Sequence, residues 1–341
     1  MTSRWGSSRS LLPTREVRAD AALGTGARSA LSRLSPTALA SRAGGRRFPL
    51  TAPPWPGGVP RPAPEHNLGV QYDTSWSRKY PVRLARAMLL DNVTRPLARV
   101  LASPLLRGVV ELESVEAPVI FAANHASHVD TPLLLSCLPL AFRHRTVVAG
   151  AADYFFDRRW KADFFAFSLN AIPIERNKVN RRSAQLAAEL IDDGWSLIIF
   201  PEGGRSPDGW AQEFTGGAAY LSSRTGRPVV PVHLDGTRHI LPKGGTSITR
   251  TRTTVTFGTP LWPEEGERTR ALSGRIEAAV ATLADEASTD WWTARKRAVG
   301  GATPPLQGPD LPAWRRAWAL PTSTADSRDD DTPTWPNTTR P

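Results

Sequence analysis

Short apolar runs alternate with amphipathic stretches through the middle of the chain, between about residues 80 and 290. The runs have the length and the flanking turn residues of buried strands. We predict strands at 119–123, 146–149, 171–174, 196–200, 229–234 and 251–257. We predict helices that begin near Asp130 and that cover 181–193, 212–223 and 269–287. This order predicts an α/β fold with a mainly parallel central sheet flanked by helices.

A helix-like pattern precedes these strands, at about 80–108. Apolar residues recur there at spacings of three and four, with arginines between them, and Pro96 and Pro104 are expected to break the segment into an amphipathic helical hairpin. Such a basic helical pair can lie on an anionic membrane surface, or its apolar face can pack on the core. No apolar stretch reaches the ~18–20 residues that span a bilayer.

The two ends of the chain lack any sustained period. We predict a disordered Arg/Pro/Gly-rich extension at 1–70, the folded domain at 71–290, and an irregular tail at 291–341 in which tryptophan stands beside arginine. Tryptophan and arginine together suit a membrane interface, and the tryptophans could equally wrap the tail onto the core.

The charge is strongly positive and unevenly placed. The chain carries a net charge of +11, and residues 1–65 hold ten arginines against three acids. A core with little net charge is unlike a DNA-binding domain, so nucleic acid is not an expected partner. The single cysteine, Cys137, lies in an apolar run and is expected to be a buried hydrophobe. We expect a cytoplasmic protein, peripheral on the inner face of the membrane.

A first chemical motif, Asn124-His125 followed by Asp130, comes directly after the strand 119–123. The carboxyl ends of parallel strands are where ligands collect. Five residues on one helix would separate His125 from Asp130 by about 140°, so the chain must turn before a helix starts near Asp130. A carboxylate on Nδ1 then leaves Nε2 to remove a proton from a hydroxyl. No serine or cysteine nucleophile in a recognisable elbow accompanies the pair, so the substrate's own hydroxyl is the expected nucleophile.

A second motif, Phe-Pro-Glu-Gly-Gly-Arg-Ser at 200–206, again follows a buried strand. Its glycines would let backbone N–H groups approach a ligand, and Arg205 offers a planar fork for phosphate. The strand 171–174 leads to Arg176, a possible second cation at the same edge of the sheet.

These motifs in this order resemble the phospholipid/glycerol acyltransferase family, which includes 1-acyl-sn-glycerol-3-phosphate acyltransferases, over about 80–285. The resemblance implies that His125 is the general base and Asp130 its orienting partner. It implies further residues for the phosphate-bearing acceptor site: Arg176, Glu202, Gly203 and Arg205. It also implies a lysophospholipid acceptor and acyl-CoA or acyl carrier protein as co-substrate, with no cofactor and no metal.

Three positions depart from the family pattern. Gly204 stands where threonine is usual, no lysine follows Phe214, and Asn170 stands where glycine is common. One cation fewer near the site leaves open an acceptor other than lysophosphatidate.

Two other classes of function remain open. His125, His128 and Asp130, completed by His233 or His239, could form the metal site of a metallohydrolase, although the Gly-Arg motif has no role there. The basic N-terminus and the Trp/Arg tail could instead make a membrane- or nucleic-acid-binding protein.

Overall fold

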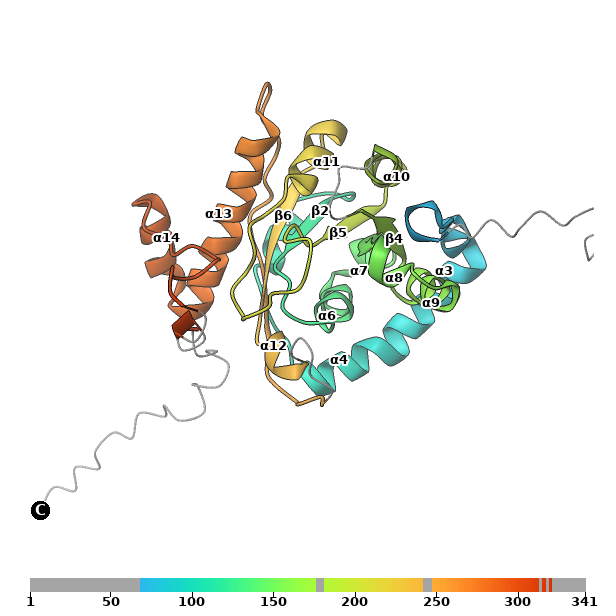
Figure 1. Ribbon diagram of the computed structural model, residues 1–341, viewed down its shortest axis with the longest axis horizontal. Helices are drawn as coiled ribbons and strands as arrows, with labels where there is room; N and C mark the ends of the chain where they lie inside the picture. Colours follow the sequence, from blue (N-terminus) through green and yellow to red (C-terminus); the bar gives the residue numbers. More distant parts are fainter. Residues whose placement is uncertain (1–67, 176–180, 242–246, 313–314, 317–318, 321–341) are drawn as a thin grey trace, which may run out of the picture. The chain divides into compact units, whose positions relative to one another are not determined.

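A seven-stranded sheet forms the centre of the computed structural model, which describes residues 68–175, 181–241, 247–312, 315–316 and 319–320 (Figure 1). The strand order is β1-β7-β6-β2-β5-β3-β4, and every pairing is parallel except that of β6 with β7. The strands are β1 Leu105–Arg107, β2 Ile120–Ala123, β3 Thr146–Ala151, β4 Ala171–Ile174, β5 Ser196–Ile199, β6 Val229–Asp235 and β7 Thr254–Phe257. The predicted mainly parallel sheet is confirmed.

Helices cover both faces of this sheet. Along β2, Phe121 and Ala123 face one apolar cluster and Ile120 and Ala122 face another, as the alternation of a strand requires. The first cluster is closed by α4 Arg95–Ala102, α5 Val109–Glu113, α6 Asp130–Cys137 and α7 Leu140–Arg143. The second is closed by α10 Arg181–Asp192, α11 Gly217–Thr225 and α13 Thr269–Ser288. The remaining helices are α3 Tyr80–Leu89, α8 Ala152–Phe155, α9 Arg159–Leu169, α12 Thr237–Ile240 and α14 Trp291–Val299.

The predicted helical hairpin is instead one continuous helical segment, in which α3 and α4 are joined by a π-helical turn, Leu90–Thr94 (Figure 1). In this wider turn the Arg95 N–H donates to the Leu90 carbonyl, and Pro96 lies in the first turn of α4, where a missing N–H is tolerated. The helix ends at Ser103, whose backbone is left-handed, and the chain then enters β1. The sequence pattern had placed β1 inside the hairpin.

The segment after Asp290, predicted to be irregular, begins with α14. The Asp290 side chain caps this helix by accepting from the Thr293 N–H, and Arg297 on α14 donates to the buried Asp285 of α13 at 2.7 Å. The predicted disordered extension falls almost wholly outside the described residues.

Among the described residues, no helix is both long enough and apolar enough to cross a bilayer.

Cys137 is buried in the core. Burial raises the pKa of its thiol to about 12, as suits a small core hydrophobe.

Candidate active site

The central strand β2 delivers the first motif to the carboxyl edge of the sheet. Asn124, the residue directly after β2, makes two hydrogen bonds to Leu234 of β6. Its side-chain amide donates to the Leu234 carbonyl at 2.9 Å, and the Leu234 N–H donates to the amide oxygen at 2.7 Å. These two hydrogen bonds fix the point at which the chain turns away from β2. The residue that follows is His125.

His125 and Asp130 meet as their spacing required. The chain turns after His125, α6 begins at Asp130, and His125 Nδ1 lies 2.8 Å from Asp130 Oδ2. The carboxylate is fully buried, and its Oδ2 also accepts the backbone N–H groups of Ala126 and Ser127 at 2.7 and 2.8 Å. These donors offset the loss of hydration that burial imposes on a charge. Asp130 therefore holds the imidazole by Nδ1, and Nε2 is left for a substrate.

The second motif packs directly on the first. The His125 ring stacks on Phe200 at a centroid distance of 4.2 Å, and the Ser206 N–H donates to the His125 carbonyl at 2.8 Å. Glu202 of the second motif also joins the two segments, because its carboxylate accepts hydrogen bonds from the backbone N–H groups of His125 at 2.7 Å and Gln212 at 2.8 Å. The two motifs, 77 residues apart in sequence, thus form one unit.

The Glu202 carboxylate therefore bonds to backbone groups of two loops, and Glu202 is not among the residues that line the cavity beside His125. It is 6% exposed, and burial raises its pKa to about 7 against the two backbone N–H groups, which lower it. The sequence pattern could not show this, because both of its partners are backbone groups of other loops.

Gly203 and Arg205 line the same cavity as His125. Gly203 has φ +68°, a left-handed conformation that favours glycine, and its N–H closes a turn onto the Phe200 carbonyl at 3.1 Å. The Gln212 side chain donates to the carbonyls of Gly204 and Arg205 at 3.3 and 3.2 Å, which steadies the turn. Arg176, the predicted second cation, lies outside the described residues.

A cavity of about 740 Å³ opens beside the pair, within the ~300–1,000 Å³ typical of small-molecule sites. His125, Gly203 and Arg205 line its polar part. The rest is mainly apolar and runs between the sheet and α9, α10 and α11, with side chains such as Val148, Phe165, Ala187, Leu197, Ile199 and Leu221. The arrangement places a base and a cation at one end of an apolar chamber.

His128 also lines this cavity, but it is turned to another partner. Its ring stacks on Tyr154 at 5.7 Å, and its Nε2 lies 3.3 Å from the Tyr154 hydroxyl. Burial, and then the nearby Arg205 and His125, lower the pKa of His128. Among the described residues, no group of three or more His, Cys, Asp or Glu is arranged to hold a metal ion.

The C-terminal segment contacts the loop 207–212 that follows the second motif, and the sequence pattern did not predict these contacts. The Trp210 indole donates to the Arg316 carbonyl at 2.9 Å, and the Arg316 guanidinium donates to Asp208 at 2.9 Å. The Ala211 N–H donates to the Leu306 carbonyl at 3.1 Å. Arg316 thus brings the tail onto the core here, and Trp314 and Trp318 of the tail lie outside the described residues.

Asn170, one departure from the family pattern, has a local cause. It ends α9 with φ +55°, and asparagine tolerates this left-handed conformation better than most residues. Its side chain accepts from Ser77 Oγ at 3.1 Å and donates to the Thr146 carbonyl at 2.9 Å. The change from glycine therefore adds contacts at the base of α3.

Part of the chain is similar in sequence to known proteins. Residues 107–235 match the family model described as Acyltransferase. The chain is 30% identical over 145 residues to 1-acyl-sn-glycerol-3-phosphate acyltransferase BAT2 of Brassica napus, covering 42% of this chain and 40% of that one. It is 30% identical over 148 residues to the lyso-ornithine lipid O-acyltransferase of Pseudomonas aeruginosa, covering 43% and 54%.

A solved structure is also similar. The 1-acyl-sn-glycerophosphate acyltransferase of Thermotoga maritima gives a TM-score of 0.48 at 24% identity, over 62% of this chain and 85% of that chain. The chain covers less than two thirds of the length of the two curated relatives above. The matched family region contains the His125–Asp130 pair, the 200–206 motif and strands β2 to β6, and over this region the chain is similar to acyltransferases.

Proposed function

We propose that this chain is an O-acyltransferase that moves a fatty acyl group from a thioester, acyl-CoA or acyl carrier protein, to the free hydroxyl of a lysophospholipid such as 1-acyl-glycerol-3-phosphate. The observation that carries the proposal is the oriented His125–Asp130 pair at the polar end of a large apolar cavity. One matched relative is named a 1-acyl-sn-glycerol-3-phosphate acyltransferase and another a lyso-ornithine lipid O-acyltransferase.

In the proposed reaction, Asp130 holds the His125 imidazole so that Nε2 removes the proton of the acceptor hydroxyl. The oxygen forms an ester bond with the acyl carbon as the carbon–sulfur bond breaks. The leaving thiolate takes the proton from the imidazolium, which restores the neutral base. No covalent acyl-enzyme is needed, because both reactants are bound together and the hydroxyl itself is the nucleophile.

The two ends of the cavity suit the two parts of a lipid. Arg205 supplies positive charge near His125 for an acceptor phosphate, since a guanidinium matches its planar pairs of oxygens. The apolar part, between the sheet and α9 to α11, supplies a surface on which a fatty acyl chain loses contact with water.

Membrane association is part of the proposal. The α3–α4 helical segment exposes apolar side chains with arginines between them: Leu84 at 52%, Met88 at 60%, Leu97 at 53% and Val100 at 52%. Such a surface fits the boundary between lipid headgroups and acyl chains of an anionic leaflet, and would bring the site to its lipid substrates.

The test is thiol release from a long-chain acyl-CoA by the purified chain, with and without lysophosphatidate. His125→Ala is compared with His239→Ala, a substitution of an exposed histidine on α12. We expect release that requires both the acceptor and His125, with the His239 variant unchanged. Release without acceptor would indicate a thioesterase instead, and near-normal release by His125→Ala would overturn the proposed base.

The donor is settled by a second arm of the same experiment. Acyl-CoA and acyl carrier protein thioesters of one chain length are compared at equal concentration. Release from the carrier protein alone would name that donor, and release from neither with any lysophospholipid would contradict the proposal.

A further inference from the structure

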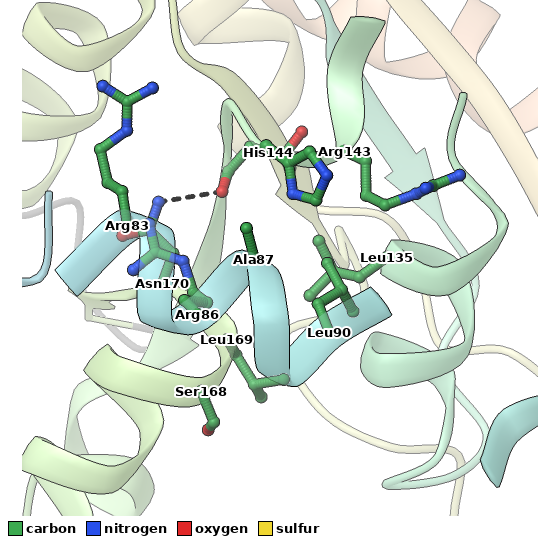
Figure 2. A pocket seen from close by; sticks show the side chains of 11 residues that line it. Arg83, Arg86, Ala87, Leu90, Leu135, Arg143, His144, Ser168, Leu169 and Asn170 are labelled. Atoms are coloured by element: carbon green, nitrogen blue, oxygen red, sulfur yellow. Dashed lines mark hydrogen bonds between the residues drawn. The ribbon is translucent and has the colours of Figure 1, made fainter. Parts of the chain in front are cut away.

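A second, small pocket lies at the opposite edge of the sheet from His125, where β3 begins at Thr146 (Figure 2). It is enclosed by α3, the end of α7 and the end of α9, and its volume is about 10 Å³. A cavity of this size admits one water-sized atom.

Three arginines, Arg83, Arg86 and Arg143, line this pocket together with the imidazole of His144. None of the described lining residues is acidic. The nearby Asp91 is already shared, because it pairs with Arg95 at 3.3 Å, Arg143 at 3.1 Å and His144 at 3.0 Å. One carboxylate therefore faces several basic groups, and the pocket has an excess of positive charge.

Arg86 is the residue of this pocket whose buried guanidinium has an unsatisfied hydrogen-bond donor. It is 7% exposed, and its guanidinium makes one hydrogen bond, from Nη1 to the Ser77 carbonyl at 2.8 Å, while its buried Nη2 has no hydrogen-bond partner. Figure 2 shows the guanidinium beside Asn170, whose own side-chain oxygen accepts from Ser77 Oγ. Burial lowers the pKa of Arg86 to about 10, and the nearby Arg83 and Arg78 act in the same direction. A buried cation without a counter-charge is strongly unfavourable.

We propose that this pocket binds a phosphate group, one oxygen of which enters the cavity and accepts a hydrogen bond from Arg86 Nη2. The small volume excludes a whole phosphate but admits one oxygen, and the remaining oxygens face the other basic groups of the rim. A water molecule would satisfy the N–H but would leave the excess charge uncompensated, whereas an oxyanion satisfies both needs.

The phosphate can belong to a phospholipid headgroup or to free phosphate. α3 and α9 pack against each other, and close to the pocket they expose Leu84 and Met88 on α3 and Phe164 on α9. A lipid headgroup on Arg86 would orient α3 on the membrane, and free phosphate would stabilise the base of α3. The experiment separates these sources.

The first experiment measures thermal unfolding in inorganic phosphate and in chloride at equal ionic strength. The wild type is compared with Arg86→Met, with Arg99→Met as a matched control on the exposed side of α4, and with Arg205→Met, which removes the cation at the larger cavity. We expect phosphate to raise the Tm of the wild type and of the Arg99 and Arg205 variants by a few degrees, because it binds the folded state. Arg86→Met should lose this rise. In chloride it should be no less stable than the wild type, because it removes an uncompensated charge.

A rise that persists in Arg86→Met, or that disappears in Arg205→Met, would overturn the proposal. Should Arg86→Met fail to fold, Arg83→Gln decides, because Arg83 lines the same pocket and is partly exposed. An undiminished phosphate response in Arg83→Gln would then contradict the site.

The second experiment identifies the source of the phosphate by co-sedimentation with phosphatidylcholine vesicles, with and without phosphatidic acid. Weaker binding of Arg86→Met than of the wild type to the phosphatidic acid vesicles identifies the lipid headgroup. Equal binding of the two proteins, together with the lost thermal response, identifies free phosphate. Neither experiment uses acyl transfer, so the phosphate site can fail without affecting the proposed function.

Discussion

At the scale of single residues, the site depends on a few buried carboxylates whose partners are mostly backbone groups. Asp130 Oδ2 accepts from the His125 ring and from two backbone N–H groups. Glu202 accepts from the backbone of His125 and Gln212. One carboxylate thus orients the His125 imidazole from the side of α6, and the other holds the main chain of His125.

Asp130→Asn tests the orienting role. An amide keeps the size of the side chain but has one acceptor oxygen, so it cannot stabilise an imidazolium as a carboxylate does. We expect kcat for thiol release to fall by about 10²- to 10⁴-fold, the usual contribution of an acid–base group, with a smaller change in KM. The measurement is steady-state kinetics on protein whose cooperative unfolding is intact, and a kcat near that of the wild type would show that Asp130 only caps α6.

Glu202 gives a prediction for stability against pH. Burial raises its pKa from 4.5 to about 7, so between these values the folded state binds more protons than the unfolded state. The contribution of Glu202 to stability is therefore full below pH 4.5 and is lost as the pH rises through about 7. The variant Glu202→Gln should lack this part of the pH dependence. The free energy of unfolding of the wild type should therefore fall, on raising the pH across this range, by on the order of 3 kcal/mol more than that of the variant. Urea unfolding at about pH 5 and about pH 8 measures it, and equal pH slopes for both proteins would refute the shifted pKa.

At the scale of elements, the loop 207–212 contacts both the turn at 200–206 and the C-terminal segment. Gln212 contacts the turn through Glu202 and through the carbonyls of Gly204 and Arg205. Arg316 contacts the same loop at Asp208 and Trp210, and it also donates to the carbonyls of Gln307 and Pro309. The tail therefore helps to set the position of Arg205 without lining the cavity.

Removing the Arg316 side chain should loosen this loop. For Arg316→Ala we expect KM for the lysophospholipid to rise on the order of 5- to 10-fold with little change in kcat, because a partly exposed charge-assisted contact contributes about 1 kcal/mol. Arg295→Ala on α14, whose cation lies over Trp291 at 5.8 Å, is the control. The kinetics of the two variants are compared, and a fall confined to kcat would contradict a positioning role.

At the scale of the whole molecule, the described features of the site and of the α3–α4 segment belong to one compact unit, His66–Pro341. Residues 1–65, which carry much of the chain's net positive charge, are not part of that unit. We expect a chain without residues 1–65 to keep its thiol release, and to keep its binding to anionic vesicles through the exposed apolar side chains of α3 and α4. Loss of vesicle binding on deletion would instead support a basic N-terminus as the membrane contact.

The elements that could be predicted from the sequence were those with strong local patterns. β4 matched its predicted range, and β2, β3, β5, β6 and α13 differed at their ends by a few residues, because buried strands and amphipathic helices have their own periods. α11 began later, at Gly217, because residues of the preceding loop bond to the Glu202 segment rather than to a helix. β1 was missed, because a three-residue strand is defined by its pairing with β7 and not by a pattern of its own.

Local patterns along the chain are enough to predict the mainly parallel sheet, the two motifs at strand ends and the contact of His125 with Asp130, since each depends on neighbours close along the chain. Three other features follow from the fold alone: α3 and α4 form one helical segment, the Glu202 carboxylate bonds to backbone groups of two loops, and Arg316 reaches Asp208. The same holds for the buried, unsatisfied Arg86. Each of these depends on a partner far along the chain or on the loss of water from a charged group, and neither leaves a period or a spacing in the sequence.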